Sequence, residues 1–149
     1  MFRQSVLLAA AGFLAVAAPG ASAQNAIATA DGEVSGTRIE ITELSRTSGE
    51  TLTLKFRIVN DSDANVNPYD LMQHEDVREV HLIDASGKKK YLVIKDSDGK
   101  CVCSTGLSSA LGTGKSINLW ARFPAPPAEL KEISVVFPHF IPADAPIAE

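Results

Sequence analysis

The only two cysteines of the chain, Cys101 and Cys103, stand two residues apart. In an oxidising compartment, two thiols this close in sequence are expected to form a disulfide. In a regular strand their Cα atoms would be roughly 6.6 Å apart, which is near the upper limit for such a bond. The bond therefore requires a bend after Gly99. Three interpretations stay open: a structural disulfide, a redox-labile pair, and a soft-metal site for Cu(I) or Zn.

A metal site at the cysteines would need further ligands. The side chains that could supply them are His74, His81, His139 and Met72. No His-x-Met or His-x-x-x-His spacing is present among them, although such spacings are typical of metal sites. We therefore expect no bound cofactor.

Two acidic turns have the residue types of a calcium loop, because calcium prefers several carboxylate and carbonyl oxygens on a tight turn. Asp61 and Asp63 begin like an EF-hand loop, but Val66 replaces the glycine that the loop requires. Asp96 and Asp98 form a shorter version. We expect ordinary turn chemistry at both places.

Trp120 is the candidate for a binding surface. The apolar residues of its segment alternate with polar ones, which places Trp120 on the opposite face together with Asn118 and Arg122. An exposed tryptophan beside an arginine is typical of an interface. The alternative is that the proline-rich tail or residues 60–75 cover the ring.

No acid, base and nucleophile stand together in the sequence, so we expect a protein that is not an enzyme. The carboxylates whose convergence in the fold would change that expectation are Asp70, Glu75 and Asp76.

The elements that must position these residues are β-strands. Apolar and polar residues alternate with a period of two, and turn residues separate the alternating segments. This pattern predicts an all-β, immunoglobulin-like antiparallel sandwich of about seven strands. We expect the strands at residues 38–42, 51–58, 77–84, 90–95, 101–103, 117–123 and 133–137.

The N-terminus has the features of a cleaved signal peptide over residues 1–23. Arg3 precedes an apolar run at residues 6–18, and a small-x-small site ends at Ala23. The run covers roughly 13 residues, short of the ~20 that a transmembrane helix needs. We expect a periplasmic or secreted bacterial protein without a transmembrane anchor.

Two segments flank the expected core of the domain, which extends over residues 34–149. Residues 24–33 are small and polar and predict a flexible leader. The proline-rich tail over residues 138–147 is predicted to run extended across the sandwich, packing Phe140 and Ile141 onto it.

The formal net charge of the full chain is −4. This acidic balance gives no basic surface for nucleic acid. The one dense basic run, Lys88-Lys89-Lys90, follows a glycine and is predicted to lie in a solvated turn. The alternative is a contact patch for an acidic partner or an anionic surface.

Residues 91–104 (YLVIKDSDGKCVCS), followed by residues 123–127 (FPAPP) and 138–140 (PHF), carry a family resemblance. Over roughly residues 34–147 the chain resembles a group of uncharacterised exported bacterial proteins. These are small immunoglobulin-like sandwiches, found alone or beside OmpA-like peptidoglycan-binding domains. The resemblance implies an envelope location, a binding or structural role, and no catalytic residues.

Together these observations predict an exported, non-catalytic binding or structural domain of the bacterial cell envelope. Its partner would be an envelope protein or glycan, and its oligomeric state is open. The alternative is a periplasmic redox or soft-metal-handling protein centred on Cys101 and Cys103.

Overall fold

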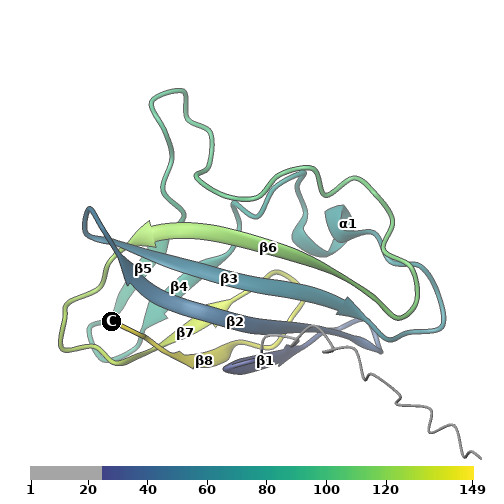
Figure 1. The fold of residues 1–149 in the computed structure, drawn as a ribbon, viewed down its shortest axis with the longest axis horizontal. Helices are drawn as coiled ribbons and strands as arrows, with labels where there is room; N and C mark the ends of the chain where they lie inside the picture. The colour runs from purple at the N-terminus through teal and green to yellow at the C-terminus, as the bar shows by residue number, and fades with distance from the viewer. Residues whose placement is uncertain (1–24) are drawn as a thin grey trace, which may run out of the picture.

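The computed structural model describes residues 25–149, so the expected signal peptide lies outside the described residues. Two antiparallel sheets of four strands face each other (Figure 1). The first has the order β1-β2-β3-β6 and the second β5-β4-β7-β8. The elements are β1 (Ala28–Asp31), β2 (Thr37–Thr47), β3 (Thr51–Asn60), α1 (Pro68–Met72), β4 (His81–Asp84), β5 (Lys89–Leu92), β6 (Lys115–Pro124), β7 (Glu132–Val136) and β8 (Ala143–Pro146). The prediction of an all-β sandwich is confirmed.

The first sheet is built from long strands whose inward residues are apolar. β2 and β3 form an antiparallel hairpin, and β6 pairs along the whole length of β3. The ladder between β2 and β3 is interrupted once, where Ile41 pairs with Phe56 and Glu43 pairs with Lys55. Thr42 is therefore the extra residue of a β-bulge, which bends the strand locally.

The second sheet is built from strands of four or five residues. β4 was expected to begin at residue 77, but only His81–Asp84 form the strand. Val77 and Val80 precede it and are fully buried, so their apolar character reflects packing outside the ladder. β5 forms only over Lys89–Leu92 instead of the predicted residues 90–95, and its Leu92 is 59% exposed.

The core lies between the two sheets. Phe56 of the first sheet packs against Phe137, which follows β7, with ring centroids 4.9 Å apart. Phe140 packs against Phe137 from the tail, at 6.5 Å. Full burial of one large apolar side chain contributes about 1.5–3 kcal/mol, so this core holds the sheets together.

The expected leader over residues 24–33 contains a strand. Ala28–Asp31 form β1 and pair with β2, with Ala30 opposite Ile39. Ala30 is buried, but its side chain is too small to produce a strong hydrophobic alternation. The prediction of a flexible leader is wrong for these residues.

The proline-rich tail also contains a strand, β8, which pairs with β7. Pro146 stands at the end of β8, where a missing N–H is tolerated. Phe140 is buried as expected, but Ile141 is 63% exposed, so its predicted packing is wrong.

Residues 101–103 do not form the predicted regular strand. Cys101 and Cys103 make only isolated bridges, to Lys95 and Ala121 respectively. With β1 and β8 added and this segment removed, residues 25–149 form eight strands rather than about seven.

The segment that follows β3 and the segment that precedes β6 are tied together at the end of β3. The amide of Asn60 donates hydrogen bonds to the carbonyl oxygens of Ala64 and Leu111, each at 2.9 Å.

Within residues 25–149, no helix has the length and apolar character needed to span a membrane.

Candidate functional site

Trp120, the only tryptophan of the chain, points outward from the first sheet and is 40% exposed. Its neighbours across β3 are set by the register: Lys55 lies opposite Trp120 and Arg57 lies opposite Asn118. Two β-strands of ten residues therefore hold the indole, an amide and two cationic side chains on one face.

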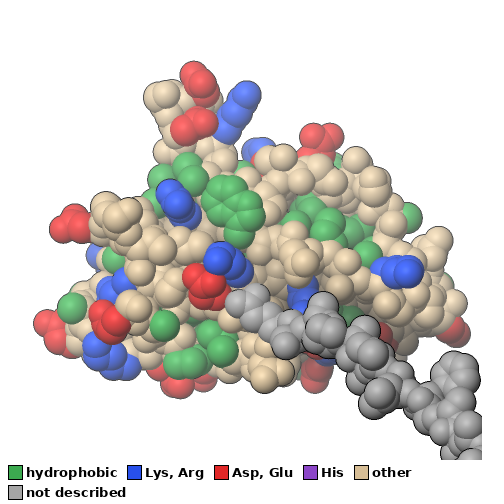
Figure 2. All heavy atoms as spheres, viewed as in Figure 1, with side chains coloured by type: hydrophobic (Ala, Val, Ile, Leu, Met, Phe, Trp, Pro, Cys, Tyr) green, Lys and Arg blue, Asp and Glu red, His purple; other side chains and the backbone are tan. Residues whose placement is uncertain are grey.

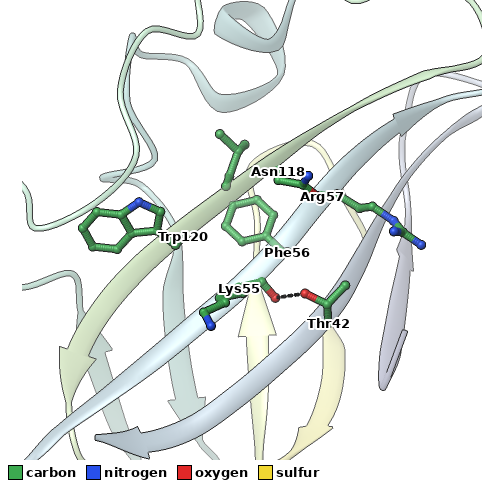
Figure 3. Close-up of a pocket in the computed structure, with 7 residues that line it drawn as sticks. Thr42, Lys55, Phe56, Arg57, Asn118 and Trp120 are labelled. Carbon is green, nitrogen blue, oxygen red and sulfur yellow. Dashed lines mark hydrogen bonds between the residues drawn. The ribbon is translucent and has the colours of Figure 1, made fainter. Parts of the chain in front are cut away.

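A shallow hollow of about 400 Å³ lies beside the indole (Figure 3). Its lining residues are Thr42, Lys55, Phe56, Arg57, Asn118, Leu119 and Trp120. None of them belongs to the tail or to residues 60–75, the two segments that were candidates to cover the ring. The outward position predicted for Trp120 and Asn118 is thus the position that the structure gives them.

The bulge at Thr42 forms one wall of the hollow. The hydroxyl of Thr42 donates a hydrogen bond to the carbonyl oxygen of Lys55 at 3.2 Å (Figure 3). Bulges re-aim side chains and bend the strand that carries them. The bend at Thr42 accounts for a hollow on a sheet face that would otherwise be flat.

Two glutamates of β2 neutralise cations at the hollow. Lys55 pairs with Glu43 at 2.7 Å, and this hydrogen bond lowers the pKa of the Glu43 carboxyl. Burial raises the pKa of the Glu40 carboxyl, but hydrogen bonds from Arg38 and Arg57 outweigh burial and hold it below its usual value. Both carboxylates are therefore ionised at neutral pH.

Arg122 differs from these cations. Among residues 25–149, its guanidinium has no ion-pair partner and no hydrogen-bonded side chain. It lies two residues from Trp120 on the same outward face of β6. Figure 2 views this face and shows Lys and Arg side chains beside hydrophobic ones over the region of β6. The face therefore offers an aromatic ring and a cation that an acidic ligand can engage.

The edge of β6 that does not pair with β3 is covered by the segment that carries the cysteines. Trp120 donates its backbone N–H to the hydroxyl oxygen of Ser104 at 2.8 Å and accepts the Ser104 N–H at 2.9 Å. Arg122 donates its backbone N–H to the carbonyl oxygen of Val102 at 3.0 Å. These bonds fix the backbone at both Trp120 and Arg122.

Cys101 and Cys103 are paired, with Cα atoms 5.3 Å apart, closer than in a regular strand. The bend that the pairing requires is present. Gly99 has a φ of 75°, and its N–H donates to the carbonyl oxygen of Asp96 at 3.0 Å. The turn after Asp96 therefore delivers the cysteines in an irregular conformation that brings their side chains together.

Asp76 joins the two cysteines. One carboxylate oxygen of Asp76 and the sulfurs of Cys101 and Cys103 all lie within 4.8 Å of one another. Asp76 comes from the segment before β4, where it makes an isolated bridge to Thr105. From the sequence, Asp76 was considered only as one of three carboxylates that could converge in an enzyme site. Nothing in the residue spacing predicts that it lies beside Cys101.

Arg78 holds the Asp76 carboxylate in place. Its side-chain Nε and Nη2 donate to the two carboxylate oxygens at 2.8 and 2.6 Å. These hydrogen bonds lower the pKa of the Asp76 carboxyl, which is almost fully buried. A buried, ionised carboxylate therefore lies beside the cysteine pair.

The other carboxylates of the possible enzyme cluster do not join Asp76. Asp70 is exposed on α1 and Glu75 is exposed in the following loop. Among residues 25–149, the one group of three or more metal-ligating side chains is that of Asp76 with the two cysteines.

The histidines proposed as metal ligands lie in ordinary polar contacts. His74 pairs with Glu79 at 3.2 Å, and the Nδ1 of His81 lies 3.1 Å from the carbonyl oxygen of Glu79. His139 pairs with Glu33 at 2.8 Å. None of the three joins the cysteines.

The calcium candidates take part in local hydrogen bonding. The carboxylate of Asp96 accepts the N–H groups of Asp98 and Lys100, each at 2.9 Å, which is turn chemistry. Asp61 forms an ion pair with Arg38, and Asp63 is exposed. Neither pair of aspartates gathers a third metal-ligating side chain within residues 25–149.

Sequence reasoning missed Thr42, Lys55 and Arg57 as parts of the hollow. A signal for the bulge was present, because the inward residues Ile41 and Leu44 are three positions apart instead of two.

Comparison of the chain with models of protein families and with curated proteins gives no match.

Proposed function

We propose that the protein is an exported, non-catalytic domain that binds an acidic glycan of the cell envelope on the outer face of its first sheet. The observation that carries the proposal is the exposed Trp120 beside a hollow of mixed polar and apolar lining. The cation of Arg122, which has no side-chain partner among residues 25–149, lies on the same strand.

A sugar ring matches the chemistry of this face. An indole is large, rigid and apolar on its faces, so it can stack against the apolar face of a sugar ring. The ring hydroxyls would then meet the amide of Asn118 and the hydroxyl of Thr42, which line the hollow. Lys55 and Arg57 supply further hydrogen-bond donors.

The hollow has room for a sugar residue, which needs far less surface than a protein partner. Sites for small ligands enclose about 300–1,000 Å³, and this hollow of about 400 Å³ falls in that range. A stable protein interface instead covers about 800 Å² on each partner. A short stretch of glycan fits the hollow without such an area.

Arg122 favours an acidic glycan. Lys55 and Arg57 already pair with glutamates of β2, whereas Arg122 has no partner among residues 25–149. Guanidinium groups bind carboxylates through two parallel hydrogen bonds. A carboxylate on the sugar next to the stacked ring would find its partner in Arg122.

The strand order supports an immunoglobulin-type sandwich. In the letters used for that fold, β2, β3 and β6 correspond to A, B and E, while β5, β4, β7 and β8 correspond to C′, C, F and G. Domains of this type serve often as binding modules. Export by a cleaved signal peptide and the resemblance to exported envelope proteins belong to the same proposal.

The cysteine pair has a structural role in this proposal. A disulfide between Cys101 and Cys103 would stiffen the segment whose backbone bonds hold Trp120 and Arg122. The intact mass of the purified protein tests it, because the disulfide form is 2 hydrogens lighter and resists alkylation.

The proposed function is tested on an array of neutral and acidic bacterial polysaccharide fragments. The wild-type protein is expected to retain acidic fragments, and the Trp120→Ala variant is expected to lose them. Ile83→Ala, which removes an exposed apolar side chain from the second sheet, is the matched control. Equal retention by wild type and Trp120→Ala, or no retention of any fragment, contradicts the proposal.

A further inference from the structure

We propose that Cys101, Cys103 and Asp76 bind a zinc ion when the two cysteines are reduced. The inference rests on side chains that do not line the hollow beside Trp120, so it goes beyond the proposed glycan binding.

The distances suit a single ion. The three ligand atoms lie within 4.8 Å of one another. Around a tetrahedral zinc ion with Zn–S of about 2.3 Å and Zn–O of about 2.0–2.2 Å, neighbouring ligand atoms are separated by roughly 3.5–3.8 Å. The sulfurs of Cys101 and Cys103 are bonded to each other in the structure, and reduction of that bond allows them to separate to this spacing.

The Asp76 carboxylate keeps a free coordination position. A carboxylate offers about four lone-pair sites. Arg78 occupies three of them: its backbone N–H and Nε bind Oδ1, and its Nη2 binds Oδ2. The remaining site on Oδ2 can bind a metal while Arg78 holds the group in orientation, as outer partners of metal ligands do.

The donor set selects the metal. Thiolates favour soft ions such as Cu(I) and Zn²⁺, whereas a carboxylate favours harder ions. Two thiolates with one carboxylate therefore suit zinc better than Cu(I). The fourth position is left to water, and half-buried Cys101 gives solvent access to it while Cys103 and Asp76 are buried.

The site forms in two balanced steps. A protein dithiol reduces the disulfide: it is oxidised to its own disulfide, and Cys101 and Cys103 each gain one hydrogen. Zinc then displaces the two thiol protons, which pass to solvent, and binds the two thiolates and the existing Asp76 carboxylate.

The experiment uses the purified protein with Zn²⁺ and Co²⁺ as probes, with and without a phosphine reductant in oxygen-free buffer. Native mass spectrometry gives the stoichiometry, and the visible absorption of tetrahedral cobalt thiolate reports the ligands. The reduced protein is expected to bind one ion and the oxidised protein none. Equal binding by the two forms overturns the proposal.

Two variants distinguish a residue that binds the metal from a residue that only orients the metal ligand. Asp76→Asn and Arg78→Gln both break the ion pair between these residues, but only the first removes a ligand. Asp76→Asn is expected to weaken cobalt binding by more than about a hundredfold. Arg78→Gln is expected to weaken it by about 10- to 100-fold at most, which is typical of a residue that hydrogen-bonds a metal ligand. Equal losses in the two variants overturn the assignment of Asp76.

Two further variants complete the test. Cys103→Ser is expected to abolish the cobalt spectrum, and persistence of the spectrum overturns the proposal. Asp70→Asn removes an exposed carboxylate on α1 and is expected to bind like wild type. A loss in Asp70→Asn equal to that in Asp76→Asn would assign the effect to net charge and overturn the site.

Discussion

The outer faces of the two sheets carry hollows of similar size and different chemistry. The hollow beside Trp120 on the first sheet has a volume of about 400 Å³, and the hollow beside Ile83 on the second has about 330 Å³. The first is lined by an indole and two cationic side chains. The second is lined by three carboxylates, those of Asp84, Glu132 and Asp144, and by no aromatic or cationic side chain.

The volume of a hollow therefore does not identify which face of this molecule binds a ligand. The two hollows differ in the side chains that line them rather than in size. Only the first combines a rigid aromatic surface with positive charge, and the carboxylates of the second would repel an acidic ligand. The proposed function therefore rests on residue types held in register, and the predictions below compare the two faces.

The largest expected effect is on glycan affinity. Trp120→Ala removes the stacking surface and is expected to cost about 2 kcal/mol or more, roughly thirtyfold in Kd. Ile83→Ala on the second face is expected to leave Kd unchanged. Isothermal titration calorimetry with an acidic fragment measures both. An equal loss in the two variants would remove the distinction between the faces.

Deletion of Thr42 tests the bulge. The deletion leaves Ile41, Glu43 and Leu44 in a regular in-out-in alternation, so the core contacts of β2 are retained. The hollow loses its wall, and affinity for the fragment is expected to fall about tenfold, or 1.4 kcal/mol. Thermal unfolding verifies that the variant is folded, and unchanged affinity in a folded variant would contradict the role of the bulge.

The ion pairs of the first face predict a pH dependence. Because the folded state lowers the pKa of Glu40, its ionised form stabilises the protein above the ordinary glutamate pKa of about 4.3, and this contribution is lost as pH falls through the lower folded value. Glu40→Gln is therefore expected to lower stability by about 1 kcal/mol at neutral pH and by progressively less in acid.

Urea unfolding at several pH values measures this difference. Glu132→Gln changes an exposed carboxylate on the second face that has no ion pair among residues 25–149, and it serves as the control. A deficit in Glu40→Gln that grows as the pH falls would contradict the assignment.

Arg122→Gln has the smallest expected effect. Loss of one exposed cation is expected to weaken binding of the acidic fragment a few-fold, mainly through slower association, and to reduce its dependence on salt. Surface plasmon resonance at two ionic strengths measures this effect. Unchanged salt dependence would show that Arg122 does not meet the ligand.

The sequence predicted the strands that carry large apolar side chains at every second position. β3 follows this pattern over residues 51–58 and β6 over residues 117–123, and the outward residues of these stretches were therefore predictable. β1 and β8 were missed because their inward residues are alanines, among them Ala30 and Ala145. Alanine fits where strands approach closely, but it gives little hydrophobic contrast.

The candidate sites were predictable to different extents. The outward position of Trp120 follows from local alternation, which a sequence displays directly. The approach of Asp76 to the cysteines depends on how the loop before β4 meets residues 101–105, a contact between segments about 25 residues apart with no periodic signal. Loops of this kind are positioned by tertiary packing rather than by local propensity.

Fluorescence titration of the single tryptophan with acidic polysaccharide fragments tests the central claim most directly. Every emission change reports on Trp120, because the chain has no other tryptophan. Stacking of a sugar ring is expected to shift the emission to shorter wavelength and to saturate, while fragments with reduced carboxyl groups bind more weakly. Fragments that bind by calorimetry without any change in emission would contradict the account.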